Sequence, residues 1–354
     1  MTNNLPQVDA IDVVEKLGAY AVELSGKTIV FTGAGGFLGQ HFMNVFRHLN
    51  DSVLDTPCRV LAMDNFVTGV GGEAWEDMSG HIQRIKHNVI DPFEFDEDID
   101  YIFHAASIAS PYFYRAFPLE TLDVATQGTR HMLDLAQRCG ARFVHFSSSE
   151  IYGDPDSVHV PTPESYRGNV SCRGPRACYD ESKRLGETLG YVYFTKFGTS
   201  TVAVRPFNVY GPGMNENDYR VLPNFASRIK AGEPLMVYGS GKQTRTFCYI
   251  TDAMAGFLLA AIRGVAGEVY NIGNPEPEIS MLDLVTTVEQ VAGARVSHEI
   301  IEYPDSYPAD EPLRRCPDIT KARRQLGFSP DVGLADGLKR FFDWTEVVYT
   351  GEQK

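Results

Sequence analysis

A tyrosine and a lysine four positions apart, Tyr179 and Lys183, are the first residues in this chain whose spacing could do chemistry. They open a long segment with helical periodicity, and positions i and i+4 of a helix share one face. An ammonium beside a phenol favours the phenolate, which brings a group with a free pKa of about 10 toward useful base strength. The pair therefore predicts a general base for a substrate hydroxyl. A second match to this spacing, Tyr238 to Lys242, falls in a glycine-rich turn, where the two side chains have no fixed relation.

The stretch FSSSEIYG, residues 146–153, puts three serines directly before a carboxylate, Glu150. A serine at a strand end can hydrogen-bond the reacting oxygen, and we predict Ser148 for this role. Side chains alternate along a strand, so Ser148 and Glu150 face the same side if the strand continues that far. A hydroxyl and a carboxylate would then face one substrate. The alternative is a glutamate in an exposed loop.

Glycines at positions 33, 36 and 39 follow one strand-like apolar run and open a helical one. In that context they predict a dinucleotide-binding turn, because Gly33, Gly36 and Gly39 let the backbone approach a pyrophosphate at the positive end of the following helix. Phe37 and Leu38 lie in the same loop and are expected to contact the cofactor. The alternative is a simple left-handed turn between strand and helix.

Asp64 closes the second apolar run, RVLAMD at 59–64. A carboxylate there accepts hydrogen bonds from a ribose 2′-hydroxyl and repels a 2′-phosphate, which favours NAD over NADP, and Asn65 is expected on the cofactor as well. The gap from the glycines exceeds the usual ~20 residues, so an insertion is expected between them. Alternatively, Asp64 caps the turn before Asn65. A nicotinamide that accepts a hydride while Tyr179 takes a proton performs alcohol oxidation.

The elements that must position these residues alternate along the chain. Short β-rich apolar runs and amphipathic helical segments follow one another, which indicates an α/β fold: a Rossmann-type doubly wound parallel sheet with a smaller C-terminal substrate-binding lobe. We predict an extension over residues 1–25, an NAD-binding domain over 26–205 with a returning segment near 246–273, and the lobe over 206–354. The strand-like runs are KTIVFT (27–32), RVLAMD (59–64), YIFHAAS (101–107), FVHFSSS (143–149), TVAVRPF (201–207) and VYNIGNP (269–275).

The N-terminal extension has the pattern of a short amphipathic helix. We expect it to dock on the domain surface, with an oligomer contact as the alternative. Its early acids, and the lack of a basic start followed by an apolar block, argue against a signal peptide. The residues expected on one face are Val8, Ile11, Val14, Leu17 and Leu24.

The 354 residues include 32 basic and 46 acidic side chains, a formal charge of −14. This balance argues against nucleic acid and anionic membranes as partners, but leaves room for a small anion in a local basic pocket. No apolar run approaches the roughly 18 residues that span a bilayer. The six cysteines show no CxxC pairing or zinc spacing, so we expect no metal and a reducing, cytoplasmic location.

Several longer motifs resemble those of the extended short-chain dehydrogenase/reductase family of nucleotide-sugar enzymes, and most closely those of its UDP-glucuronate decarboxylases. The resemblance runs from about Lys27 to Trp344, and GPRACYDESKR and GKQTRTFCY are more specific than the glycine loop. The motifs are DNFVTG (64–69), HAASIASP (104–111), SSSEIYGDP (147–155), GNVSCRGPRACYDESKR (168–184), FNVYGPGM (207–214), GKQTRTFCYITD (241–252), NIGNP (271–275) and PLRRCPDITKA (312–322).

The resemblance implies an oxidation triad of Ser148, Tyr179 and Lys183 that works with NAD on a nucleotide sugar. It also implies a homodimer formed through helices of the first domain. Without that context, Arg245 is an arginine in a Gly/Thr-rich loop, for which an ion pair is the simpler expectation. The positions that match substrate-binding residues of the family are Asn208, Arg220, Tyr238 and Arg245.

The pair Ser149-Glu150 distinguishes among the reactions of the family that the chain resembles. Plain 4-epimerases usually carry small or apolar residues there, 4,6-dehydratases carry Asp-Glu, and decarboxylases carry Ser-Glu. Decarboxylases also use an arginine that matches Arg315, with its neighbour Arg314 as the alternative. The resemblance thus implies oxidation of UDP-glucuronate at C4, loss of CO2 from the 4-keto acid, and return of the hydride to give UDP-xylose. Glu150, Ser149 and Arg315 would orient the sugar and help deliver the proton.

The chain departs from the family pattern at several positions. Ala125 stands where an asparagine is common, Asn88 where an aspartate often contacts the adenine, and Ser148 where decarboxylases usually have threonine. These departures leave the redox residues intact but leave the exact sugar and base open. The alternatives are a 4-epimerase or 4,6-dehydratase and, more remotely, a non-catalytic NAD-binding sensor or scaffold. Retention of both Tyr179 and Lys183 argues against the sensor.

Overall fold

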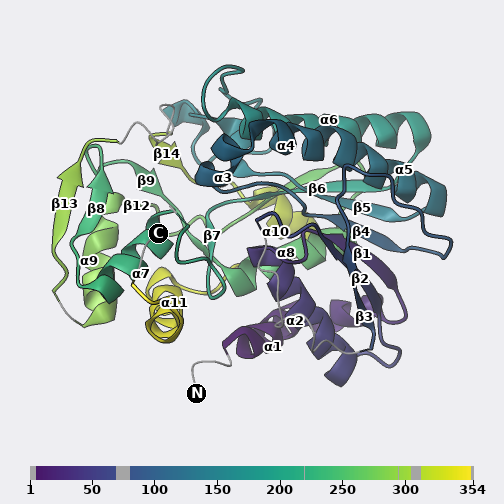
Figure 1. The fold of residues 1–354 in the computed structure, drawn as a ribbon, viewed down its shortest axis with the longest axis horizontal. Coiled ribbons are helices and arrows are strands. Elements are labelled where there is room, and N and C mark those ends of the chain that lie inside the picture. Colours follow the sequence, from purple (N-terminus) through teal and green to yellow (C-terminus); the bar gives the residue numbers. More distant parts are fainter. Residues whose placement is uncertain (1–4, 69–79, 219, 294, 304–311, 352–354) are drawn as a thin grey trace.

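The computed structural model describes residues 5–68, 80–218, 220–293, 295–303 and 312–351, shown as a ribbon in Figure 1. Two segments discussed above reach beyond these ranges: residues 1–4 of the N-terminal extension and Gly69, the last residue of the motif at 64–69, lie outside the described residues.

Seven parallel strands form the central sheet, in the order β11-β6-β5-β4-β1-β2-β3. This order confirms the predicted doubly wound sheet, because it runs outward in both directions from β1 and so creates a crevice at the carboxyl ends of the strands between β1 and β4. The strands are β1 (Thr28–Thr32), β2 (Arg59–Asp64), β3 (Ile82–Lys86), β4 (Tyr101–His104), β5 (Arg142–Phe146), β6 (Thr201–Pro206) and β11 (Val269–Ile272).

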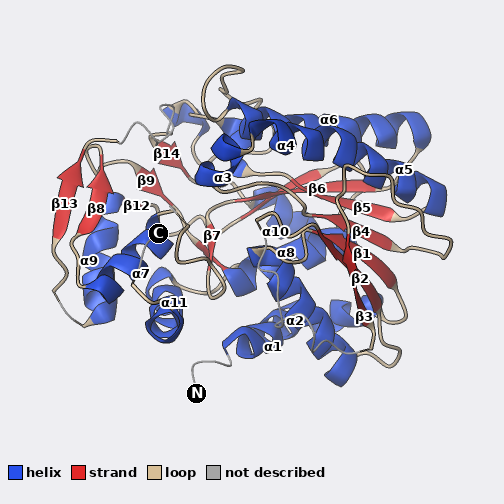
Figure 2. Ribbon diagram, in the orientation of Figure 1, coloured by secondary structure: helices blue, strands red, loops and turns tan. Residues whose placement is uncertain are grey.

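Helices cover both faces of this sheet, as Figure 2 shows. The face with α1, α2 and α8 lies below the sheet in that view, and the face with α4, α5 and α6 lies above it; α10 packs against α8. On these faces lie α1 (Leu5–Leu17), η2 (Gly18–Leu24), α2 (Phe37–Ser52), α3 (Pro111–Ala116), α4 (Pro118–Asp123), the π-helical turn η4 (Val124–Gly128), α5 (Thr129–Cys139), α6 (Ala177–Phe197), α8 (Ile250–Arg263) and α10 (Thr320–Leu326).

Strand alternation divides the apolar side chains between two cores. Ile29 and Phe31 of β1 pack into the larger core on the α2 and α8 side, whereas Val30 packs on the opposite face against Met132 and Leu133 of α5. All five side chains are fully buried. A strand buried on both faces reads as a continuous apolar run rather than an alternating one, which is how β1, β2 and β5 read in the sequence.

A smaller lobe lies beside the sheet, at the left of Figure 1. Its strands form short pairs: β13 with β8, β12 and β14 with β9, and β10 with β7. From this lobe the chain returns through α8 to the sheet, where β11 pairs with β6. The elements are β7 (Val209–Tyr210), α7 (Val221–Ala231), β8 (Leu235–Tyr238), β9 (Thr244–Arg245), β10 (Cys248–Tyr249), β12 (Ile279–Ser280), α9 (Met281–Ala292), β13 (His298–Ile301), β14 (Arg314–Arg315) and α11 (Leu334–Val348).

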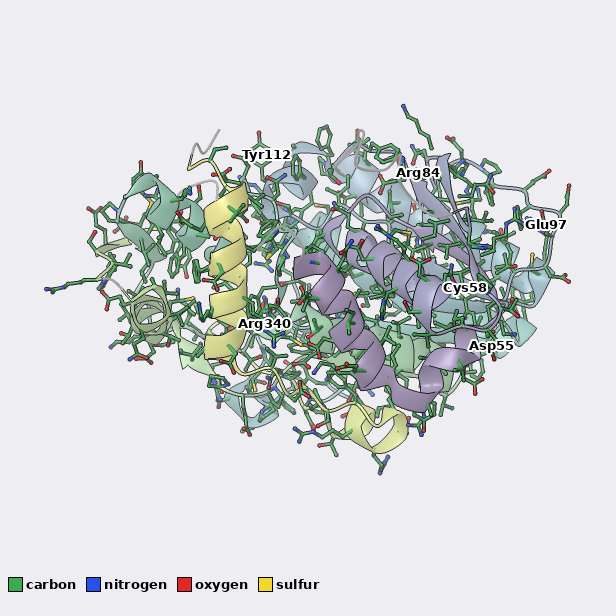
Figure 3. All side chains as sticks on the ribbon, turned by 90° about the horizontal axis from the view of Figure 1, so that it is seen from below. Asp55, Cys58, Arg84, Glu97, Tyr112 and Arg340 are labelled. Carbon is green, nitrogen blue, oxygen red and sulfur yellow. The ribbon has the colours of Figure 1, made fainter. Side chains whose placement is uncertain are left out.

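The N-terminal helix α1 packs between α2, α8 and α11, and Figure 3 shows α1 beside α11 with Arg340 on the latter. Leu17 is buried as expected, but Val8 and Ile11 are 53% and 43% exposed, so the expected single face is wrong. Nine residues separate Val8 from Leu17, which is about half a turn of rotation around an α-helix. The buried stripe consists of Asp9, Ala10, Val13, Val14 and Leu17.

Candidate active site

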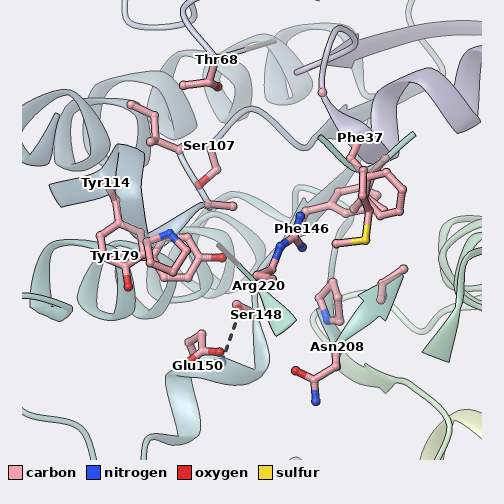
Figure 4. A pocket seen from close by; sticks show the side chains of 18 of the residues that line it. Phe37, Thr68, Ser107, Tyr114, Phe146, Ser148, Glu150, Tyr179, Asn208 and Arg220 are labelled. Carbon is pink, nitrogen blue, oxygen red and sulfur yellow. Dashed lines mark hydrogen bonds between the residues drawn. The ribbon is translucent and has the colours of Figure 1, made fainter. Parts of the chain in front are cut away.

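A cleft of about 480 Å³ opens at the carboxyl ends of the sheet strands and extends to the smaller lobe. Ligands of open α/β sheets bind in this crevice. Every site residue predicted from the sequence lines it, and Figure 4 shows part of its wall. These residues are Gly33, Gly36, Phe37, Leu38, Gly39, Asp64, Asn65, Asn88, Ser148, Ser149, Glu150, Tyr179, Lys183, Asn208, Arg220, Tyr238, Arg245 and Arg315.

The glycine turn between β1 and α2 is built by close backbone contacts. Gly33 has a φ of +80°, and a Cβ there would lie 2.8 Å from the amide nitrogen of Ala106. A Cβ on Gly39 would lie 2.4 Å from the carbonyl oxygen of Gly33. Both positions therefore exclude a side chain, and α2 begins directly behind the turn with its positive end toward the cleft.

Asp64 ends β2 beside this turn. Its Oδ2 accepts a hydrogen bond from the Gly35 amide at 2.8 Å, and its Oδ1 accepts one from the Phe66 amide at 2.7 Å. Asp64 thus caps the turn after β2, as the alternative expected, and it also lines the cleft, where its contact with a ribose stays a prediction. Beside it, the Asn65 side-chain amide donates to Asn88 Oδ1 at 3.4 Å.

Tyr179 and Lys183 lie on one face of α6, with Nζ 5.7 Å from the centroid of the phenol ring. Lys183 Nζ donates to the Phe146 carbonyl at 2.7 Å, and burial lowers the Lys183 pKa to about 7. Burial also raises the pKa of Tyr179 to about 12, opposed by a hydrogen bond with Ser148. In the protein alone, lost solvation of the phenolate therefore outweighs the hydrogen bond with Ser148, and the lowering of the Tyr179 pKa by Lys183 stays a prediction.

A second tyrosine, Tyr114 of α3, stacks on Tyr179 with ring centroids 5.2 Å apart and ring planes at 12° (Figure 4). Tyr114 is 2% exposed and lines the cleft. The stack fixes the orientation of the Tyr179 ring. Sequence reasoning did not find Tyr114, since no spacing rule connects it to residues of α6.

The serine run does not continue the strand. β5 ends at Phe146, and residues Ser149–Tyr152 form a 3-10 helix, η5. The alternation argument for Ser148 and Glu150 is therefore wrong, although both side chains line the cleft. Ser148 caps η5 and accepts a hydrogen bond from the Glu150 amide at 3.2 Å, and Ser149 is 3% exposed. The helical turn, rather than the pleat, brings hydroxyl and carboxylate together.

Glu150 is held by two arginines. Arg315 Nη1 lies 2.6 Å from Oε1 and Arg315 Nη2 lies 2.7 Å from Oε2, which is a bidentate pair. Arg176, immediately before α6, also donates to Oε2 through Nη2. Arg176 is 8% exposed and Arg315 is 7% exposed. Arg176 was not singled out from the sequence, although it belongs to GPRACYDESKR, the motif that contains Tyr179 and Lys183.

The neighbouring arginine, Arg314, points elsewhere. Its guanidinium forms a bidentate pair with Glu278 at 2.7 and 2.6 Å, and its side chain is 41% exposed. Successive side chains of a strand point to opposite sides, so only one of the two arginines of β14 can face the cleft. That arginine is Arg315.

Two further arginines line the part of the cleft that the lobe contributes. Arg220 precedes α7, and its Nε donates to Asp218 at 2.8 Å. Arg245 of β9 is 6% exposed, and its Nη1 donates to its neighbour's carbonyl, that of Thr244, at 2.8 Å. Both put a permanent positive charge on the wall of the cleft.

Asn208 and Tyr238 complete the predicted substrate residues. Asn208 has a φ of +41°, and its Nδ2 donates to the Thr246 carbonyl at 2.8 Å, which ties the segment after β6 to the lobe. Tyr238 ends β8 and stacks on Tyr303, with centroids 5.9 Å apart. Both tyrosines line the cleft and provide aromatic surface there.

The sheet order, the glycine turn and the Ser148–Tyr179–Lys183 group define a nicotinamide-dinucleotide enzyme on a Rossmann-type fold. The NAD dependent epimerase/dehydratase family matches residues 29–273, more than half of the chain, and the chain belongs to that family. Its dependence on NAD agrees with the carboxylate of Asp64 at the end of β2. The resemblance to nucleotide-sugar enzymes of the extended short-chain dehydrogenase/reductase type is confirmed.

Curated relatives are similar over most of the chain. UDP-glucuronic acid decarboxylase 1 of Xenopus tropicalis is 41% identical over 320 residues, which are 90% of this chain and 72% of that protein. UDP-glucuronic acid decarboxylase 5 of Arabidopsis thaliana is 39% identical over 316 residues, which are 89% of this chain and 88% of that protein.

Solved structures share the fold over nine-tenths of the chain. The UDP-glucuronic acid 4-epimerase of Bacillus cereus, solved with UDP-glucuronic acid and NAD, matches with a TM-score of 0.74 and 26% identity, over 91% of this chain and 100% of that one. The dTDP-glucose 4,6-dehydratase of Streptomyces venezuelae, solved with NAD, matches with a TM-score of 0.75 and 26% identity, over 90% and 96% of the two chains.

Proposed function

We propose that the protein is an NAD-dependent carboxy-lyase that converts UDP-glucuronate to UDP-xylose through a 4-keto intermediate. The observation that carries the proposal is the bidentate contact of Arg315 with Glu150 in the cleft that also holds Tyr179. This contact places groups suited to carboxylate chemistry in the same cleft as the tyrosine that we assign to alcohol oxidation. The relatives named UDP-glucuronic acid decarboxylases support this choice of substrate.

In this proposal Tyr179 takes the proton of the C4 hydroxyl while Ser148 holds the oxygen. The glycine turn and Asp64 would hold NAD, which would supply the hydride chemistry at C4. The product of oxidation is a β-keto acid, whose loss of CO2 leaves an enolate. Tyr179, again protonated, donates a hydrogen bond to the enolate oxygen and thereby stabilises the transition state for carbon loss.

Arg315 and Arg176 orient the sugar carboxylate. A guanidinium matches a carboxylate in a planar, bidentate geometry, and Arg315 already holds Glu150 in this way. Glu150 keeps both guanidinium groups in place until the substrate carboxylate joins them. The same Glu150 lies within the cleft and is the carboxyl that we assign to proton delivery at C5.

The smaller lobe, residues 206–354, is proposed to bind the nucleotide part of the substrate, and residues 26–205 with the returning segment near 246–273 to bind NAD. Arg220 and Arg245 supply positive charge for the diphosphate. Asn208 and Tyr238, which line the same end of the cleft, are assigned to the ribose and its neighbourhood. The base of the nucleotide is taken to be uracil from the relatives' names.

We also propose a cytoplasmic homodimer formed through helices of the first domain. The exposed face of α6 supports this, since Tyr191, Val192 and Phe197 are 60%, 42% and 45% exposed. The six free cysteines fit a reducing compartment. Among the described residues, no helix is long and apolar enough to cross a membrane. Light scattering on the purified protein measures the oligomeric state, and a monomeric mass would contradict the dimer.

The test of the activity is incubation of the purified protein with UDP-glucuronate and catalytic NAD, followed by mass spectrometry. The expected products are CO2 and a UDP-pentose. An isomer of unchanged mass would instead indicate a 4-epimerase, and loss of water a dehydratase. Binding of NAD without turnover of any nucleotide sugar would favour a sensor or scaffold.

A further inference from the structure

A second carboxyl group lies behind Glu150. Asp180, in the first turn of α6, is 6% exposed, and its Oδ2 lies 3.6 Å from Nε of Arg176. Its Oδ1 is buried and has no hydrogen-bond partner within the described part of the chain. Asp180 and Glu150 therefore share one guanidinium, that of Arg176, and only Glu150 reaches the cleft.

The charges around Asp180 come from four elements. Burial, followed by the charge of Glu150, raises its pKa to about 7, against the guanidinium groups of Arg176 and Arg315. A carboxyl group with this pKa can hold or release a proton near neutral pH. The titratable and charged groups that face it are Glu150 of η5, Arg176 before α6, Arg315 of β14, Tyr114 of α3, and Cys178 and Tyr179 of α6 itself.

The proposed reaction consumes one proton in each turnover. A carboxylate is lost as neutral CO2, the electron pair of the broken C5–C6 bond passes into the enolate, and a new C5–H bond forms from that pair and a proton. Tyr179 cannot be its source, because the proton that it takes from the C4 hydroxyl returns to that oxygen at the end of the cycle. A second group must hold the proton for C5.

We propose that Asp180 takes up a proton as the substrate carboxylate enters and gives it up to C5 through Glu150 after CO2 has left; this rests on the proposed function. Without substrate, two carboxylates face two guanidinium groups. The substrate adds a third carboxylate, so that the buried site carries an excess negative charge. Protonation of Asp180 removes this excess charge. Carbon loss leaves the negative charge on the enolate, and the stored proton neutralises it at C5.

In this proposal Asp180 holds the proton behind Glu150 and does not itself contact the sugar. Both carboxyl groups contact the Arg176 guanidinium, so a proton held on Asp180 can pass to Glu150 once the substrate carboxylate is gone. Arg176 holds the pair together. Proton uptake is thereby coupled to the substrate carboxylate, which is the group that the reaction removes.

Calorimetric titration tests the uptake. The Tyr179→Phe variant loaded with NAD is titrated with UDP-glucuronate at about pH 8, in buffers of different ionisation enthalpy. At that pH a group with a pKa near 7 is mostly ionised, so uptake of about one proton is expected on binding. The double variant Tyr179→Phe/Asp180→Asn should take up almost none, and UDP-xylose, which lacks the carboxylate, should cause none in either. Equal uptake by the two proteins with UDP-glucuronate would overturn the proposal.

Turnover gives a second test. Asp180→Asn should still release CO2 but protonate C5 about a hundredfold more slowly, so that reduced nicotinamide and a UDP-4-keto-pentose accumulate. Asp180→Ser should behave in the same way, and Asp180→Glu should recover part of the rate. Glu181→Gln, one position further along and only partly buried, should match the wild type. A merely structural role would slow oxidation and protonation alike without accumulation, and that result would overturn the inference. Absence of CO2 from the wild type would instead overturn the proposed function.

Discussion

The end of the cleft that we assign to NAD, the cofactor end, and the end that we assign to the substrate, the sugar end, are built in different ways. At the cofactor end, the turn of Gly33, Gly36 and Gly39 and the carboxylate of Asp64 come from two adjacent parallel strands, and backbone amides make the contacts. At the sugar end, side chains from three distant segments meet, since Glu150 and Arg315 are 165 positions apart. The cofactor end therefore depends on local backbone geometry, and the sugar end on long-range charge pairing.

This difference predicts that substitutions at the two ends fail in different ways. Changes at the cofactor end should weaken NAD binding and leave the type of reaction intact. Changes at the sugar end should leave NAD binding intact and should slow loss of CO2 or protonation of C5 more than oxidation at C4.

Tyr179→Phe, where the two ends meet, should lower the rate of UDP-xylose formation about a thousandfold, because it removes the only hydroxyl that we assign as base. NAD binding, measured by calorimetry, should change little. Tyr191→Phe, an exposed tyrosine of the same helix, is the matched control and should keep the wild-type rate. A rate of Tyr179→Phe within about threefold of wild type would remove Tyr179 from the mechanism.

Arg315→Ala should slow CO2 release about a hundredfold while reduction of the cofactor by UDP-glucuronate persists, because the guanidinium that orients the carboxylate is lost. Glu150→Gln should likewise slow CO2 release more than it slows reduction of the cofactor. Arg314→Ala is the adjacent control, since its half-exposed pair with Glu278 contributes at most about 1 kcal/mol. Single-turnover measurements of both steps provide the readout. Equal losses in the two arginine variants would contradict the assignment.

Gly39→Ala should weaken NAD binding about tenfold, equivalent to about 1.4 kcal/mol, because its Cβ would meet the Gly33 carbonyl at 2.4 Å. Binding of UDP should be unchanged, which calorimetry of the two ligands can establish. Gly80→Ala is the control, since no atom of the described residues lies within 4 Å of a Cβ there. If Gly39→Ala weakened the binding of UDP and of NAD equally, the proposed independence of the two ends of the cleft would be contradicted.

Asp9→Asn lies outside both ends and should leave turnover unchanged. Burial raises the pKa of Asp9 to about 7, so the folded protein keeps a proton that the unfolded chain loses near pH 4. The free energy of unfolding contributed by this group therefore falls as pH rises from about 4 to about 7. Urea unfolding measures the free energy of unfolding of Asp9→Asn and of wild type. The variant's advantage over wild type should be about 1–2 kcal/mol larger at about pH 8 than at about pH 5. The exposed control Asp343→Asn should follow the wild-type pH dependence.

The contrast between the two ends also separates what the residues alone predict from what they leave open. The run RVLAMD became β2 with the same bounds, 59–64, because a strand buried on both faces has a continuous apolar signature. The serine run after β5 gave no such signal. Polar residues at a strand end are compatible with a further strand residue or a helical turn, and the turn formed because Ser148 caps η5.

The doubly wound sheet, the family, NAD as cofactor and many of the residues that line the cleft could be predicted from the sequence, because these follow from periodicity and from motifs whose parts are close in the chain. The packing of the folded chain was needed to show that Arg315 rather than Arg314 faces Glu150, that Tyr114 stacks on Tyr179, and that Asp180 lies behind Arg176. The physical reason is that the direction of a side chain and the burial that shifts its pKa depend on what packs against it. Here those neighbours come from distant segments, and no local pattern records them.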